Sequence, residues 1–146
     1  MDVTEFFSLH EQGEIMEAIA EAEKNTSGEI RVHLENYCFG NALKRATKVF
    51  KKLGMANTAQ HNGVLFYLAV KSKKLAIVGD SGIHEHVKQH FWDELKSSML
   101  DMFAENHYKE GLTSGILATG QKLKEYFPYQ SDDVNELPDE ISFGKH

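Results

Sequence analysis

The sequence predicts an α/β sandwich, in which helices pack on a small mixed β-sheet. Two observations lead to this prediction. Residues 29–34 alternate between apolar and polar side chains, and residues 63–70 and 75–78 are apolar runs separated only by the polar segment 71–74. The segments before, between and after these strands place apolar residues at helical spacing. The predicted order of elements is α-β-α-β-β-α-α.

The first predicted helix begins after Ser8. Ser8 and Glu11 have the spacing of a capping box, in which each side chain binds the backbone N–H of the other residue. The apolar face that follows consists of Ile15, Ile19 and Ala22. We expect this helix to continue to about Lys24 and to end in the segment 25–28.

Residues 29–34 have the pattern of a half-buried strand. One face carries Ile30, Val32 and Leu34, and the other carries Glu29, Arg31 and His33. A second helix follows, with Asn41 as a plausible N-cap and Gly54 as the glycine that ends it. Its apolar stripe consists of Ala42, Ala46, Val49, Phe50 and Leu53.

The run 63–70 is rich in Val, Leu, Phe and Tyr, which is typical of a strand buried on both faces. Together with residues 75–78 it predicts an antiparallel hairpin, because the connection is so short. The helix between the first two strands is a crossover connection, so these two strands should be parallel. The sheet is therefore expected to be mixed.

Two helices are predicted after residue 82. Apolar residues recur at helical spacing from Ile83 to Met102, a stretch that allows one break, and again from Tyr108 to Phe127, where Pro128 ends the helix. Gly111 and Gly115 share one face of the last helix. We interpret them as points of close backbone approach, because a phosphate-binding loop would need a strand before it.

The 146 residues are expected to form one domain over residues 1–128, with an acidic tail at 129–146 packed on or near it. We interpret the Lys and Arg residues as scattered along the chain, which argues against a nucleic-acid partner. The net charge of −6 favours cations as binding partners. Cys38 is the only cysteine, which excludes an internal disulfide. No apolar run reaches the ~18 residues of a membrane span, and the basic start of a signal peptide is absent. We expect a cytoplasmic monomer.

The predicted strand directions bring distant polar segments to one edge of the sheet. The first and second strands begin there, after 26–28 and 61–62, the third strand ends there at 79–82, and the last helix delivers the tail to the same end. The candidate metal ligands at this edge are Glu29, Asn62, Asp80, Asp132, Asp133, Asn135 and Glu136, with Asp139 and Glu140 as further carboxylates. Oxygen donors of this kind predict calcium or magnesium as the cofactor.

Simpler interpretations of these residues stay open. Asp80 can cap the helix that follows it, Glu29 can be an exposed strand residue paired with a lysine, and the acidic tail can be a solvated extension. His86 and His90 have the i, i+4 spacing of a zinc chelate, but no third ligand is specified nearby. A solvated helix face is the favoured interpretation of these histidines.

Several segments resemble a known family. They are TSGEIRVHL (26–34), KVFKKLGM..T..HNGVLFYLAV (48–70), AIVGDSGI (76–83), FW (91–92) and YFPY..DDVNELPDEISFG (126–144). The chain resembles bacterial single-domain members of the TPM-domain family, which includes thylakoid-lumen acid-phosphatase-like proteins and photosystem II repair factors. The resemblance implies a three-layer α/β/α sandwich, binding of divalent cations, and an acid-phosphatase activity for the plant branch. By position it points to the loop around Asp80, with Glu29 and Asn62 nearby.

Residues and resemblance together predict a module that binds calcium or magnesium and serves interaction or regulation. The alternative is a metal-assisted acid phosphatase acting on phosphomonoesters, with Asp80 as nucleophile or metal ligand. That alternative is weaker, because neither Arg31 nor Arg45 is expected at the edge that would hold the phosphate. A partner-binding domain with a purely structural metal is a third possibility, and the catalytic residues, if any, are not specified.

Overall fold

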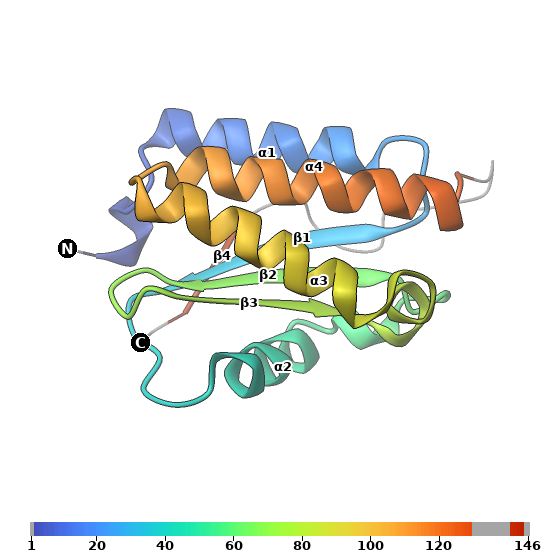
Figure 1. Cartoon of the computed structure of the whole chain (residues 1–146), viewed down its shortest axis with the longest axis horizontal. Helices are drawn as coiled ribbons and strands as arrows, with labels where there is room; N and C mark the ends of the chain where they lie inside the picture. Colours follow the sequence, from blue (N-terminus) through green and yellow to red (C-terminus); the bar gives the residue numbers. More distant parts are fainter. Residues whose placement is uncertain (1, 130–140, 145–146) are drawn as a thin grey trace.

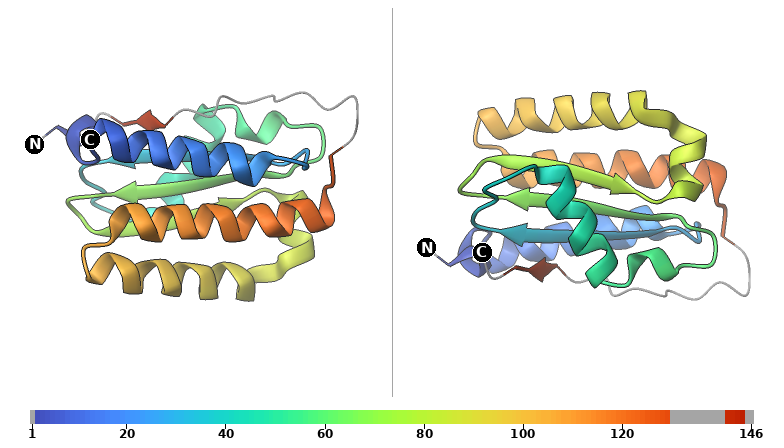
Figure 2. Two further views of the ribbon diagram at one scale, coloured as in Figure 1. Left: turned by 90° about the horizontal axis from the view of Figure 1, so that it is seen from above. Right: turned by 90° about the horizontal axis from the view of Figure 1, so that it is seen from below.

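The computed structural model describes residues 2–129 and 141–144 and has three layers, a central sheet between two layers of helices. The helices are α1 (Leu9–Glu23), α2 (Ala42–Lys52), α3 (Ser81–Ala104) and α4 (Tyr108–Tyr126), with short 3-10 turns at Val3–Glu5 and Met55–Asn57. The strands are β1 (Glu29–Glu35), β2 (Gly63–Ala69), β3 (Lys74–Gly79) and β4 (Ser142–Phe143). Figure 1 and Figure 2 show α1, α3 and α4 side by side on one face of the sheet and α2 on the other. The predicted three-layer α/β/α sandwich is confirmed.

The strand order in the sheet is β3-β2-β1-β4. β1 and β2 are parallel, and their register runs from the pair Glu29 and Gly63 to the pair Glu35 and Ala69. β2 and β3 are antiparallel, as the short connection predicts. β4 is parallel to β1 and was not predicted, because a strand of two residues has no measurable periodicity.

The apolar and the polar side chains of β1 lie on opposite faces of the sheet. Ile30, Val32 and Leu34 are fully buried in the larger core, beneath α1, α3 and α4. The smaller core lies under α2 and includes Phe50 and Tyr67. The polar side chains of β1 therefore lie on the side of the sheet that α2 covers, next to the smaller core.

The last two helices pack closely through glycine, as predicted. A Cβ atom added at Gly111 would lie 2.6 Å from Phe103 Cε1, and one at Gly115 would lie 2.4 Å from Met99 Sδ. α3 has one break, at Lys88, whose backbone is non-helical with φ 65° and ψ 172°. None of the helices in the described part of the chain is long and apolar enough to cross a bilayer.

Candidate functional site

Three strand ends meet at one edge of the sheet, as the predicted directions require. We call this the Asp80 edge and define it by Ser27, Glu29, Asn62 and Asp80. The backbone N–H of Asp80 donates to the carbonyl of Gly63 at 2.9 Å, and that of Glu29 donates to the carbonyl of Asn62 at 3.4 Å. These hydrogen bonds fix the starts of β1 and β2 against the end of β3.

The end of α4 joins the same edge. The N–H of Ser27 donates to the carbonyl of Phe127 at 3.0 Å, and Thr26 forms an isolated antiparallel bridge with Pro128. The Thr26 hydroxyl donates to two carbonyls of this helix end, those of Leu123 at 3.0 Å and of Phe127 at 2.5 Å. The prediction that the chain reaches this edge at Pro128 is therefore correct.

Asp80 caps α3. Its Oδ1 accepts a hydrogen bond from the N–H of Ser81 at 2.8 Å, while its Oδ2 lies 3.3 Å from Nδ1 of His61. Its backbone is extended, as an N-cap requires. The capping interpretation is confirmed, and the second carboxylate oxygen is directed toward the loop that enters β2.

A close backbone approach explains why glycine follows this cap. A Cβ atom added at Gly82 would lie 2.2 Å from the carbonyl oxygen of Gln60 and 2.6 Å from that of His61. The N–H of Gly82 donates to this same His61 carbonyl at 2.8 Å. The start of α3 is thus fastened to the segment before β2, which keeps Asp80 next to Asn62.

Glu29 and Asn62 are both buried at this edge, with exposures of 3% and 2%. The Asn62 amide donates from Nδ2 to the Ser27 hydroxyl at 3.2 Å. The interpretation of Glu29 as an exposed strand residue is wrong, because the edge encloses its side chain. Glu29 therefore places a carboxylate inside the edge, beside the Asn62 amide, and carboxylate and amide oxygens are donor types that hard cations prefer.

The remaining predicted ligands lie outside the described residues. They are Asp132, Asp133, Asn135 and Glu136, together with Asp139 and Glu140. Within residues 2–129 and 141–144, no three His, Cys, Asp or Glu side chains come close enough together to hold a metal ion. The assignment of these residues as metal ligands stays a prediction.

The three histidines of α3 have separate neighbours. Nδ1 of His84 accepts a hydrogen bond from the Trp92 indole at 3.1 Å. The ring of His86 stacks on Tyr126 with centroids 4.4 Å apart, and His90 lies 2.9 Å from Glu94. The break at Lys88 also disrupts the helical geometry that would bring His86 and His90 to one metal.

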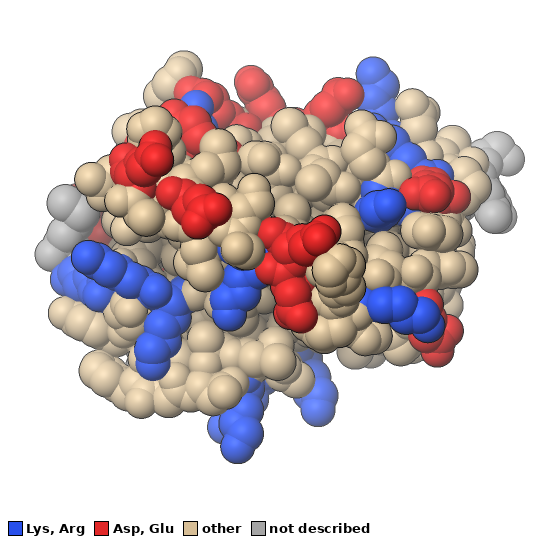
Figure 3. All heavy atoms as spheres, in the orientation of Figure 1, with Lys and Arg blue, Asp and Glu red and all other residues tan. Residues whose placement is uncertain are grey.

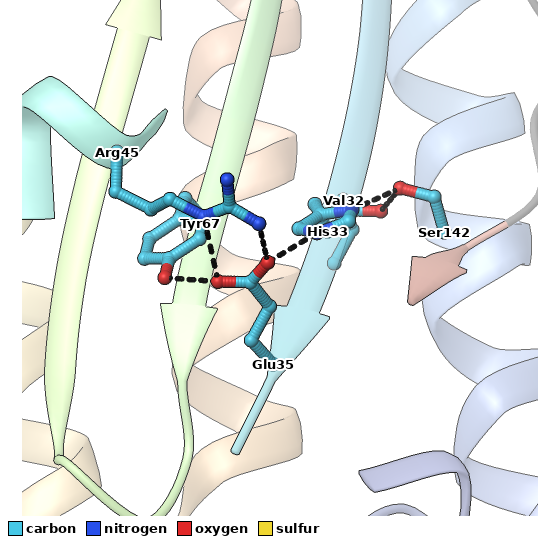
Figure 4. A network of polar contacts seen from close by, with 6 residues as sticks. All are labelled: Val32, His33, Glu35, Arg45, Tyr67 and Ser142. Carbon is cyan, nitrogen blue, oxygen red and sulfur yellow. Dashed lines mark hydrogen bonds and ion pairs between the residues drawn. The ribbon is translucent and has the colours of Figure 1, made fainter. Parts of the chain in front are cut away.

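A buried polar cluster lies at the other end of β1, where the sequence predicted no site (Figure 4). Glu35 has no exposed surface, and its carboxylate joins three elements. Arg45 of α2 donates from Nε to Oε2 at 3.1 Å and from Nη2 to Oε1. The Tyr67 hydroxyl of β2 donates to Oε2 at 2.5 Å.

His33 extends this cluster to β4. Its Nε2 lies 3.3 Å from Oε1 of Glu35, and its Nδ1 lies 2.7 Å from the Ser142 hydroxyl. Burial lowers the pKa of His33 although the neighbouring carboxylate favours the charged ring. The Ser142 hydroxyl also donates to the carbonyl of Val32 at 3.3 Å, so contacts through His33 link Glu35 to β4.

The charges of the cluster are strongly coupled. Burial alone raises the pKa of Glu35, but the hydrogen bonds from Arg45, Tyr67 and His33 outweigh it and lower the pKa to about 2. Burial and the adjacent carboxylate raise the pKa of Tyr67 well above its usual range. The carboxylate is thus ionised and the phenol neutral throughout the physiological range.

The cluster borders a pocket of about 260 Å³ between α2 and β4. Its polar lining includes His33, Arg45, Lys52 and Ser142. The polar alternation of β1 extends to Glu35, one residue beyond the predicted strand, and this was the signal that could have revealed the cluster. A single Arg next to the apolar stripe of α2 was the second signal.

Comparison with known proteins identifies a matching family and structures with the same fold. The TPM domain model matches residues 1–122. The structure of BA42 from the psychrophilic bacterium Bizionia argentinensis is 45% identical, with a TM-score of 0.89, over 98% of this chain and 99% of that protein. A search of curated proteins finds no match.

Two more distant structures share the fold alone. The N-terminal domain of a P. gingivalis protein is 19% identical with a TM-score of 0.73, over 88% of this chain and 85% of that one. The N-terminal domain of cg2496 from Corynebacterium glutamicum is 13% identical with a TM-score of 0.65, over 99% and 86%. Because the family model covers most of the chain and BA42 matches nearly all of it, this protein belongs to the TPM-domain family.

Proposed function

We propose that this TPM domain binds a divalent cation, calcium or magnesium, at the Asp80 edge and serves as an interaction or regulatory module. The observation that supports the proposal is the convergence of Glu29, Asn62 and Asp80 where three strand ends are joined by backbone hydrogen bonds. The proposal also assigns ligand roles to Asp132, Asp133, Asn135 and Glu136, outside the described residues.

The chemistry of the edge fits a hard cation. Glu29 and Asp80 supply carboxylates, and Asn62 and the loop carbonyls supply neutral oxygens, the donor types that calcium and magnesium prefer. Glu29 is buried and the Asp80 side chain is only 17% exposed, so a bound cation would neutralise charge that water solvates poorly. Ion binding is therefore expected to stabilise the fold.

Thermal unfolding with excess EDTA, calcium or magnesium tests this proposal. A ligand that binds only the folded state raises the free energy of unfolding by RT ln(1 + [L]/Kd), about 2.7 kcal/mol at a ligand concentration one hundred times Kd. We expect the melting temperature to rise with calcium or magnesium and to fall back after chelation. An unchanged melting temperature with both ions would contradict the proposal.

Asp80→Asn locates the ion. Asn caps helices as well as Asp does, so in EDTA the variant should melt close to the wild type. The loss of one carboxylate should weaken the calcium-induced rise. Asp101→Asn, at an exposed position of α3, is the matched control and should keep the full rise. Equal rises in both variants would remove Asp80 from the site.

A metal-assisted acid phosphatase is the second candidate, and the position of His61 favours it. Its side chain is 56% exposed and its Nδ1 lies 3.3 Å from the Asp80 carboxylate. A carboxylate nucleophile beside a proton donor for the leaving group is a workable arrangement for phosphomonoester hydrolysis. Turnover of p-nitrophenyl phosphate that both Asp80→Asn and His61→Asn abolish, with the fold intact, would support it. Turnover unaffected by these variants would contradict it.

A further inference from the structure

The basic residues are not scattered, in contrast to the expectation from the sequence. Residues 36–79 contain eight of the sixteen Lys and Arg and none of the twenty-two Asp and Glu. This segment therefore carries a formal charge of +8 within a chain of net charge −6. In Figure 3, Lys and Arg project from the lower edge, over α2, and cluster at the left, over the turn between β2 and β3. Most Asp and Glu of this view lie above them, and charges of both signs lie at the right.

The fold brings two loops of this segment together at the end of the sheet opposite the Asp80 edge. The loop between β1 and α2 packs on the turn between β2 and β3. Ser72 Oγ accepts from the N–H of Cys38 at 2.9 Å, and Lys74 Nζ donates to the carbonyls of Cys38 and Gly40, each at 2.9 Å. The loop therefore presents its exposed side chains from a fixed position.

Large apolar side chains stand exposed in this basic region. Phe39 is 88% exposed, Leu43 is 55% exposed and Tyr37 is 41% exposed. The rings of Tyr37 and Phe39 stack with centroids 5.5 Å apart, and Lys71 Nζ lies 5.5 Å from the centroid of Tyr37. The two stacked rings form a contiguous exposed apolar group, and such groups mark interaction surfaces more often than isolated ones do.

Lysines surround these apolar groups. A shallow pocket of about 360 Å³ is lined by Tyr37, Phe39, Lys44 and Lys48, among others. We call the surface formed by Tyr37, Phe39, Lys44, Lys48 and Lys71 the cationic face.

We propose that the cationic face docks on the surface of an anionic lipid bilayer. Phe39 enters the interfacial region, and Lys44, Lys48 and Lys71 lie among the lipid phosphates. Apolar side chains combined with a basic surround give the two attractions that interfacial binding uses. Each Lys near an anionic membrane contributes about 1 kcal/mol.

The side-chain types favour lipid over other anionic partners. Protein interfaces are enriched in Arg and depleted in Lys, whereas the exposed cations of this face are Lys. Single-stranded nucleic acid stacks its bases on free aromatic rings, but here Tyr37 is stacked on Phe39 and covered by Lys71.

Vesicle co-sedimentation in EDTA and low salt tests the proposal. The vesicles contain either phosphatidylcholine alone or equimolar phosphatidylcholine and phosphatidylglycerol. We expect the protein to sediment with the anionic vesicles, to remain in solution with the neutral ones, and to be released by high salt. Because EDTA is present, the outcome is independent of the proposed cation site.

Two variants and two matched controls locate the contact. The double variant Lys44→Glu/Lys48→Glu should weaken binding about tenfold or more, and Phe39→Ser should weaken it several-fold. The controls are Lys24→Glu/Lys96→Glu, at exposed positions outside the cationic face, and Leu9→Ser, at a residue 86% exposed on α1. All these positions are exposed, so melting temperatures should stay close to that of the wild type.

Three outcomes would overturn the proposal. One is equal binding to neutral and anionic vesicles. Another is a loss of binding in the controls as large as in the variants. The third is failure of the wild type to bind anionic vesicles, including the case in which it binds single-stranded DNA instead.

Discussion

Glu35 is ionised although its side chain has no contact with solvent. Its carboxylate accepts hydrogen bonds from Arg45 of α2 and Tyr67 of β2, and it faces His33 of its own strand. Such a group is stabilising only while all its partners are present, because an uncompensated buried charge is strongly unfavourable. The packing of α2 on the sheet therefore depends on Glu35 remaining ionised.

The stability of the protein should fall in acid in two stages. His33 has a lowered pKa, so the unfolded chain takes up its proton first and stability begins to decline below about pH 6.5. Glu35 has its ordinary pKa of 4.5 lowered to about 2, so its contribution is complete above pH 4.5 and is lost between pH 4.5 and 2. The second loss is on the order of 3 kcal/mol. Urea unfolding across this pH range measures both stages.

Glu35→Gln is the control for the second stage. It leaves the Arg45 guanidinium without a carboxylate and should cost about 3–5 kcal/mol at pH 7. The variant should also lack the loss of stability between pH 4.5 and 2. A pH profile as steep as that of the wild type would show that other carboxylates cause the acid sensitivity.

For single residues, the sequence predicted which end of the sheet a side chain lies at better than it predicted which groups that side chain contacts. Glu29, Asn62 and Asp80 could be placed at one edge because strand direction alone determines which loops meet. Burial of Glu29 and the cluster around Glu35 could not be predicted, since they depend on how far α2 covers the face of β1. That coverage depends on how the helix packs on the sheet, which the residue pattern of neither element specifies.

Among the elements, α4 is the most tightly constrained, because it packs on both α1 and α3. A Cβ atom added at Gly120 would lie 2.6 Å from Cβ and 2.7 Å from Cα of Ala22 in α1. The clash would involve the backbone of Ala22, so it could not be relieved by moving a flexible side chain. Glycine at this position sets the distance between the two helices.

Gly120→Ala should therefore destabilise the protein by about 1–3 kcal/mol, the usual range for overpacking. Gly13→Ala is the matched control on α1, where a new Cβ would meet no atom within 4 Å. It should stabilise by about 0.5–1 kcal/mol through helix propensity. Chemical denaturation of both variants measures the contrast, and effects of the same sign would contradict this account of the interface.

The cap of α3 gives a second prediction for an element. Asp80→Ala removes the acceptor for the Ser81 N–H and should cost about 1 kcal/mol in EDTA. Asp80→Asn should be close to neutral under the same conditions. If both substitutions cost equally in EDTA, the contact of the Asp80 carboxylate with His61 would outweigh the cap.

Some boundaries of helices and strands could be predicted from the sequence and others could not. The capping box at Ser8 and the helix end at Gly54 were predictable because local chemistry specifies them. The break at Lys88 has no glycine or proline to signal it, and it follows from the way α3 turns to pack over β3. β4 exists only because β1 offers an unpaired edge, a fact of the finished sheet.

For the whole molecule, net charge is a poor guide to surface behaviour. The segment 36–79 is strongly basic while the rest of the chain is acidic, and α2 with the hairpin gathers the basic part on one side. Interactions between exposed charges fade over about 10 Å at 0.1 M salt. A surface in contact with the cationic face therefore experiences a local positive charge.

We expect the protein to be retained on a sulfonate cation exchanger at pH 7 in low salt, despite its net charge of −6. Salt should elute it, and Lys44→Glu/Lys48→Glu should shift elution to markedly lower salt. The control Lys24→Glu/Lys96→Glu has the same net charge and should shift less. Equal shifts would mean that retention reflects total charge and not its distribution.

The central strand β1 separates the two ends of the molecule by a fixed length. It is paired on both sides, begins at Glu29 and ends at Glu35, a span of about 20 Å. A molecule lying with Phe39 against a flat support would hold the Asp80 edge at the far side, away from that support. A ligand bound at one end of β1 would therefore leave the other end accessible. The domain could contact a surface at one end and a second ligand at the other at the same time.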